Sequence, residues 1–111
     1  MSKNINKRVN ESLKAYMMDG PQSGILRIYN IQTGKTLLVT SDNLTGDTAK
    51  IRFQLDMGTF SHQELQDAYE KIGLELFAIE VFVISDGKKD LQTLFNESKS
   101  NLMNTGVSFY R

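Results

Sequence analysis

The sequence predicts a single α+β domain, in which a small three-stranded mixed or antiparallel sheet is flanked by helices. Three observations predict it. The chain has 111 residues, which suits one domain and is too short for two. Its 40% hydrophobic residues include six Phe and four Tyr, enough to fill one modest core. Segments with helical and strand-like apolar spacing follow in the order helix, strand, strand, helix, helix, strand, helix.

The first expected element is an amphipathic helix over residues 3–18, because apolar side chains recur there at helical spacing. A turn sequence at residues 19–21 ends it, so residues 1–20 are expected to form a helical unit ahead of the main domain, residues 23–104. The C-terminal tail, residues 105–111, is expected to pack back as a coil and to complete one domain overall.

A β-hairpin and a helix are expected next. Residues 24–31 and 36–41 are rich in β-branched and aromatic side chains, which favour strands. The four residues between them include Gly34, which suits a short turn. A helix is then predicted over residues 45–56, with Thr45 as its N-cap.

The second half begins with a local helix-start signal. Ser61 and Glu64 have the spacing of a capping box, and Gly73 ends the helix that follows. Residues 74–84 are the most apolar stretch, so we expect a central strand covered on both faces. Strict alternation would place Phe77, Ile79, Val81 and Val83 on one face and Ala78, Glu80 and Phe82 on the other. The last expected helix spans residues 89–103.

Composition excludes several classes of protein. The chain has 13 basic and 13 acidic residues, whereas nucleic-acid-binding proteins usually carry a basic excess. This balance argues against nucleic-acid binding without forbidding a local basic patch. It has no Cys, which excludes disulfides, thiolate zinc sites and thiol nucleophiles. No apolar run reaches the length of a signal peptide or a membrane span, so we expect a cytoplasmic protein that does not enter a membrane.

The order of elements and several local strings resemble the GIY-YIG nuclease family. Residues 24–30, GILRIYN, resemble its first motif, Gly-Ile/Val-Tyr followed by strand residues and Asn. Residues 34–41, GKTLLVTS, occupy the place of Gly-Lys-Val-Tyr-Ile-Gly-Ser-Ser. The strings at residues 52–58 and 64–73 are similar to a bacterial subgroup, and the resemblance spans residues 23–103.

That resemblance implies a site whose key side chains are replaced. Active members cut DNA with one divalent metal held by a Glu, assisted by two Tyr, an Arg and often a His. The two Tyr positions fall on Leu26 and Leu37, the Arg on Asp47, the His on Ile51 and the Glu on Phe95. Apolar side chains neither transfer protons nor bind metals, and an aspartate repels phosphate. We therefore expect a catalytically degenerate, non-cleaving protein without metal or cofactor.

A second interpretation stays open, in which the chain is a metal-dependent DNA endonuclease with a rearranged active site and a divalent metal such as Mg²⁺. Tyr29, Glu80 or Glu97 would then act in new roles. Glu97 follows Phe95 by two residues, a rotation of about 200° around a helix, so it should face solvent if Phe95 faces the core.

The sequence says less about binding partners than about the fold. Arg27, Lys35, Lys50 and Arg52 are the residues a nucleic acid would contact if they share a basic face near the hairpin, although scattered, solvated charges are the plainer interpretation. We expect His62 to be a surface residue without a local partner. Weak nucleic-acid binding, an unknown protein partner, a homo-oligomer and a remnant without a specific partner all stay open.

Overall fold

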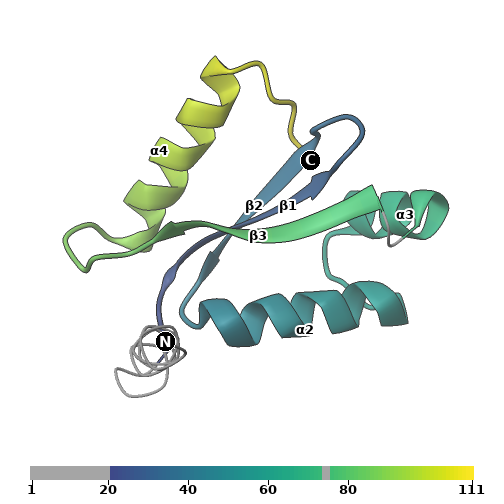
Figure 1. Ribbon diagram of the computed structural model, residues 1–111, viewed down its shortest axis with the longest axis horizontal. Helices are drawn as coiled ribbons and strands as arrows, with labels where there is room; N and C mark the ends of the chain where they lie inside the picture. The colour runs from purple at the N-terminus through teal and green to yellow at the C-terminus, as the bar shows by residue number, and fades with distance from the viewer. Residues whose placement is uncertain (1–20, 74–75) are drawn as a thin grey trace, which may run out of the picture.

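The computed structural model describes residues 21–73 and 76–111 (Figure 1). The helix expected over residues 3–18 lies outside the described residues. The elements are β1 (Gly24–Asn30), β2 (Thr36–Ser41), α2 (Leu44–Met57), α3 (Gln63–Ile72), β3 (Phe77–Ile84) and α4 (Leu91–Asn104). The predicted α+β class is confirmed, with a three-stranded antiparallel sheet and flanking helices. No helix in the described ranges is long and apolar enough to cross a bilayer.

The sheet has the order β2-β1-β3, and both pairings are antiparallel. Strand β1 therefore lies in the middle, and the expectation that residues 74–84 supply the central strand is wrong. The apolar character of β3 has another cause. Both faces of the sheet are covered, so even an edge strand needs apolar side chains in both directions.

A β-bulge in β3 changes the direction of its side chains. Ile25 pairs with Val83, whereas the next residue, Leu26, pairs with Val81, so Phe82 is an extra residue. As a result Phe82 and Val83 pack in the same cluster. The expected strict alternation through Val83 is therefore wrong.

Gly24 lies where β1 closely approaches β3, beside this bulge. A Cβ atom added at Gly24 would lie 2.0 Å from the backbone oxygen of Val83, a distance that no real Cβ tolerates. The first glycine of the opening motif is therefore required by strand packing.

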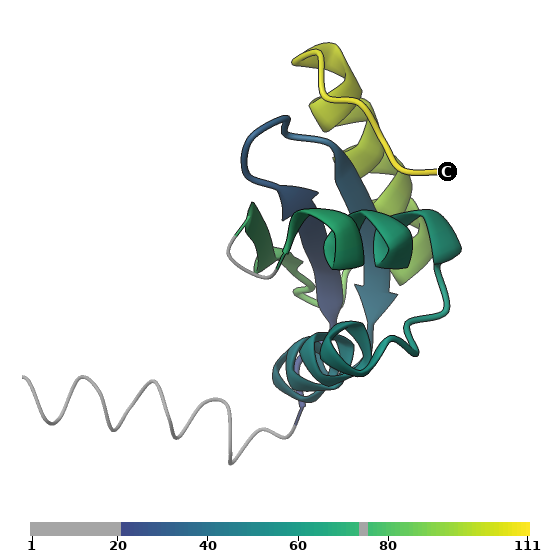
Figure 2. The same ribbon diagram turned by 90° about the vertical axis from the view of Figure 1, so that its right-hand side faces the viewer.

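Helix α2 lies on one side of the sheet and α4 on the other (Figures 1 and 2). Each face of the sheet carries its own cluster of side chains, because successive residues of β1 point to opposite faces. The α2-side core, formed with α2 and α3, contains Leu26, Ile28, Leu44, Ile51, Leu55, Phe60, Leu65, Tyr69, Phe77 and Tyr110. The α4-side core contains Ile25, Leu38 and Leu102, with Phe82, Val83, Leu94, Phe95, Val107 and Phe109 packed against them.

Two helix starts differ from the predicted caps. The N-cap of α2 is Asn43, whose side chain accepts a hydrogen bond from the amide three residues on, so the prediction of Thr45 is wrong. Helix α3 begins at Gln63, one residue too late for Ser61 to cap it. The cap is His62, whose Nδ1 accepts from the backbone N–H of Leu65 at 3.3 Å, so His62 has a local partner after all.

The residues after α4 run back along the outer edge of β2. The N–H of Thr36 donates to the carbonyl of Ser108 at 2.9 Å, and the N–H of Tyr110 donates to the carbonyl of Thr36 at 2.8 Å. Thr36 and Phe109 thereby form a parallel β-bridge. The side chain of Glu64 accepts from the backbone N–H of Arg111, which ties the tail to α3.

Candidate functional site

Three positions that the resemblance places in a nuclease site lie in or against the α2-side core. Leu26, in the middle of β1, is fully buried, and Ile51 on the inner side of α2 is 7% exposed. Leu37 of β2 packs against the same cluster. Burying a side chain of this size contributes about 2 kcal/mol to folding. Leu26 and Ile51 therefore help to hold α2 to the sheet, and Leu37 packs against the same core.

Asp47 performs a structural task at the start of α2. Its carboxylate accepts a hydrogen bond from the hydroxyl of Ser41 at 2.7 Å, and that hydroxyl accepts from the N–H of Asn43 at 3.1 Å. The carboxylate also lies in the first turn of the helix, where the positive end of the helix dipole stabilises a negative charge. Asp47 thus braces the turn between β2 and α2.

Phe95, the position aligned with the metal-binding Glu, does not join these three residues. It packs against the α4-side core, on the opposite face of the sheet from Leu26. Helix α4 covers that face, so an apolar residue on its inner side meets Leu38 and Leu102 instead. The structure therefore brings together three of the five positions and holds Phe95 apart from them.

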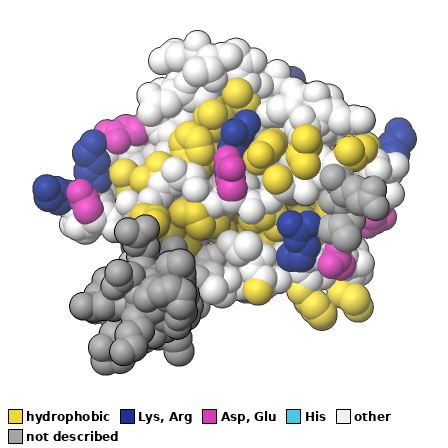
Figure 3. Space-filling view, in the orientation of Figure 1, with side chains coloured by type: hydrophobic (Ala, Val, Ile, Leu, Met, Phe, Trp, Pro, Cys, Tyr) yellow, Lys and Arg dark blue, Asp and Glu magenta, His cyan; other side chains and the backbone are white. Residues whose placement is uncertain are grey.

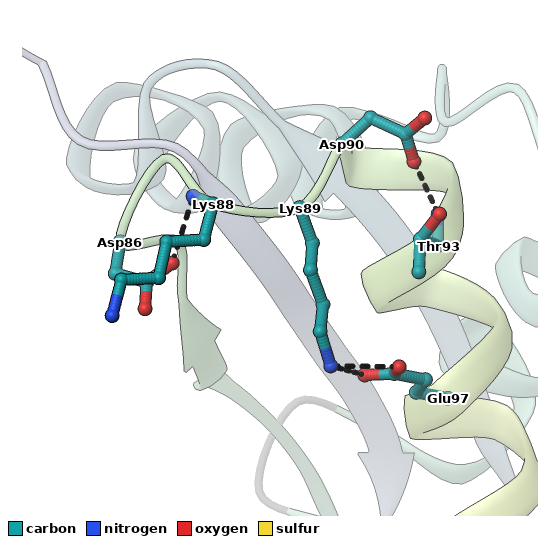
Figure 4. A network of polar contacts seen from close by, with 6 residues as sticks. All are labelled: Asp86, Lys88, Lys89, Asp90, Thr93 and Glu97. Atoms are coloured by element: carbon teal, nitrogen blue, oxygen red, sulfur yellow. Dashed lines mark hydrogen bonds and ion pairs between the residues drawn. The ribbon is translucent and has the colours of Figure 1, made fainter.

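Glu97 points away from the core, as its place on the helix predicts, and it is held by Lys89 (Figure 4). The Nζ atom of Lys89 lies 3.0 and 2.8 Å from the two carboxylate oxygens. This hydrogen bond, with the attraction between the charges, raises the pKa of Lys89. The lysine belongs to the loop before α4, in which Asp90 caps the helix by accepting from the N–H of Thr93.

A shallow groove of about 510 Å³ runs beside this ion pair, lined by Lys89, Asn96, Glu97, Ser100 and Asn101. Its one carboxylate is already paired with a lysine, which a metal ion would have to displace. Among the residues that the structure describes, no three His, Cys, Asp or Glu side chains come together as a metal site. The groove thus offers hydrogen-bonding groups and no ligand set for a divalent cation.

The register of the sheet creates a polar cluster that the sequence alone did not reveal. Arg27, which faces α4, lies over the ring of Tyr29 at 4.2 Å and 3.5 Å from the carboxylate of Glu80. Its Nε donates to the hydroxyl of Thr36 at 3.0 Å. The alternation along β1 predicts that residues 27 and 29 share a face, but the pairing of Arg27 with Glu80 depends on the strand register.

The other three basic residues do not form one face with Arg27. Lys35, in the hairpin, makes an ion pair with Glu64 of α3 at 3.2 Å and lies over the ring of Tyr110. The hydrogen bonds from the Arg111 amide and from Lys35 lower the pKa of Glu64. Lys50 is exposed on α2, and Arg52 is half-buried there.

Arg52 lies near a tyrosine–aspartate contact between α2 and α3. The hydroxyl of Tyr69 donates to the carboxylate of Asp56. Burial raises the pKa of Tyr69, the hydrogen bond to Asp56 raises it further, and Arg52 opposes both effects. The tyrosine therefore remains a protonated donor at neutral pH, and it joins the two helices.

Comparison with known proteins identifies the fold. No family model matches the sequence, and no curated protein matches it significantly. Two solved structures are similar in fold. The catalytic domain of the homing endonuclease I-TevI superposes with a TM-score of 0.62 at 19% identity, covering 79% of this chain and 95% of that one. A point variant of the same domain superposes with a TM-score of 0.61 at 17% identity, covering 81% of this chain and 92% of that one.

The chain therefore has a GIY-YIG-like fold. I-TevI is a GIY-YIG homing endonuclease, and the match spans nearly its whole catalytic domain. The two proteins share the arrangement of strands and helices. Identity below 20% does not show that they share the role of any side chain. Function has to be argued from the residues that this chain places on the fold.

Proposed function

We propose that this chain is a non-cleaving protein with the GIY-YIG endonuclease fold, and that it acts as an interaction module for a protein partner. The α2-side core carries the proposal, because Leu26 and Ile51 lie in it and Leu37 packs against it, and the resemblance assigns two tyrosines and a histidine to these three positions. Phosphodiester cleavage needs polar groups in contact with substrate and metal at such positions, and packed aliphatic side chains provide neither.

Charge supports a protein partner over a nucleic acid. The chain has no net charge, and Arg27 and Lys35 are each held by a carboxylate of the same chain. Lys50 and Arg52 lie on another element, α2. Nucleic-acid interfaces gather several unpaired basic side chains on one face, because phosphate neutralisation supplies most of the affinity.

A plasmid-nicking assay tests the absence of cleavage. Purified protein is incubated with supercoiled plasmid and Mg²⁺ or Mn²⁺, beside the variants Tyr29→Phe and Glu97→Gln. We expect the three proteins to give the same background, since neither side chain acts on DNA in this proposal. Metal-dependent nicking by the native chain that one of these substitutions abolishes would refute it.

A mobility-shift experiment at low salt tests the class of partner. We expect neither duplex nor branched DNA to be retarded. A complex that weakens steeply as salt is added would instead identify a phosphate-binding face, and would replace the protein partner with a nucleic acid.

One observation favours a second function, a metal-dependent endonuclease with a rearranged site. Arg27, Tyr29 and Glu80 meet on the α4-facing side of the sheet, and they are the side-chain types that the nuclease family uses. The same ion pair argues against it, since Arg27 neutralises the one carboxylate. Adding Glu80→Gln to the nicking assay separates the two functions, because only the second predicts a loss of activity.

A further inference from the structure

The two outer edges of the sheet differ in whether other residues cover them. Residues 108–110 pair with Thr36 and cover part of the outer edge of β2. Strand β3 pairs with β1 on one side and, within residues 21–73 and 76–111, with no strand on the other. Figure 1 shows β3 nearest the viewer, and Figure 2 shows it at the side of the sheet away from β2.

Strand β3 lacks most of the features that keep an edge strand from pairing with another chain. Residues 77–84, FAIEVFVI, contain no Lys, Arg or Pro. The one charged side chain, Glu80, is paired with Arg27 of the same chain. Natural edge strands are usually protected by lysines, prolines or unpaired inward-pointing charges. Among the residues that the structure describes, the partly exposed Glu80 and the bulge at Phe82 protect the edge, and the bulge limits regular pairing to Phe77–Val81.

Apolar side chains line this edge. Val81 and Ile84 are 42% and 48% exposed, respectively. Figure 3 shows the face that carries β3, where hydrophobic side chains form a band across the molecule and a few charged ones interrupt it. An exposed apolar band beside a row of unpaired backbone groups marks a surface for strand addition.

We propose that the outer edge of β3 pairs antiparallel with β3 of a second copy of this chain, which joins two three-stranded sheets into one. The difference between the edges supports this occupant. Head-to-tail addition of β3 to a neighbour's β2 meets the tail residues at Thr36, so growth into a filament is blocked. Pairing of β3 with β3 is self-complementary and closes after two copies.

Charge permits the same pairing. Two copies with no net charge approach each other without overall repulsion. Within the strand, Glu80 already has its counter-ion, so antiparallel pairing does not bring unpaired like charges together. The inference rests on the proposed function, for which it names the protein partner as a second copy.

Sedimentation equilibrium across micromolar to millimolar concentrations tests the proposal. The native chain should dimerise. Val81→Lys should raise the dimer dissociation constant about tenfold or more, since it places a solvated charge on the shared edge. Met103→Lys is the matched control, because Met103 is 58% exposed on α4, and it should leave the dimer unchanged. Circular dichroism checks that each variant folds.

Amide hydrogen exchange on the native chain gives an independent measurement. Amides of Phe77–Val81 should become better protected as the concentration rises, while those of α4 should not. A native chain that stays monomeric overturns the inference, and strong protection of β3 in that monomer would assign the edge to another segment of the chain. The inference is also overturned if Val81→Lys leaves the dimer intact, or if dimerisation leaves the amide exchange of β3 unchanged. None of these outcomes bears on plasmid nicking, so the two proposals fail separately.

Discussion

Replacing Leu26 with tyrosine introduces the side chain that the resemblance assigns to this position. The stability of the variant shows whether the core has room for it. Leu26 is fully buried, and Ile51 and Leu37 pack in the same core. Forcing a ring into this contact should cost about 1–3 kcal/mol through overpacking. Enclosing a hydroxyl without a partner should add about 1–3 kcal/mol. We expect the free energy of unfolding to fall by about 2–6 kcal/mol, with no gain of nicking activity.

Urea denaturation followed by circular dichroism measures this loss. With a slope of about 1–2 kcal/mol per molar urea, the midpoint should fall by more than about 1 M. Leu26→Met is the control, because it conserves volume and should cost less than about 1.5 kcal/mol. If Leu26→Tyr stayed within about 0.5 kcal/mol of the native chain, a space with a hydroxyl partner would exist there. Aliphatic side chains would then not fill the position that the resemblance assigns to a tyrosine.

Three further predictions concern the backbone and the helix caps. Gly24→Ala should lower the free energy of unfolding by at least about 2 kcal/mol in urea, because the new Cβ meets the oxygen of Val83, and an unchanged midpoint would contradict the close approach. Asn43→Ala should cost about 1 kcal/mol in the same measurement through loss of the α2 cap, whereas Asn43→Asp should cost little. Hydrogen bonds from Thr93 lower the pKa of Asp90, so its carboxylate stabilises the fold above its unfolded pKa and less as pH falls through the folded one. Asp90→Ala should therefore lower Tm at neutral pH, and the difference should shrink in acid.

Local signals predicted the elements well because they act within a few residues. The strand at residues 36–41 and the helix end at Gly73 agree with the structure. The caps were harder to predict, since two candidates stand close together and the backbone decides between them. Asn43 precedes the helix with a non-helical backbone (φ −147°, ψ 85°), whereas Thr45 already lies inside it.

Features that depend on distant residues were not predictable from one sequence. The apolar run of β3 indicated burial on both faces, and it carried no information on whether a strand lies in the middle or at an edge. The bulge at Phe82 and the pairing of Arg27 with Glu80 follow from how β3 registers against β1. For the candidate site, the resemblance put Leu26, Ile51 and Phe95 in one site, but the position of Phe95 depended on which face α4 covers.

The bridge between Thr36 and Phe109 has a consequence for folding during synthesis. The ribosome delivers β1 and β2 early, and they can form their hairpin at once because the contact is local. The residues that cover β2 follow α4 in the chain and so emerge after all three strands, and Tyr110 then completes a core begun by Leu26 and Ile28. Until that moment the edge of β2 lacks the segment that covers it at Thr36. A nascent or stalled chain is thus the form most exposed to mispairing, and chaperone contact is most useful to it.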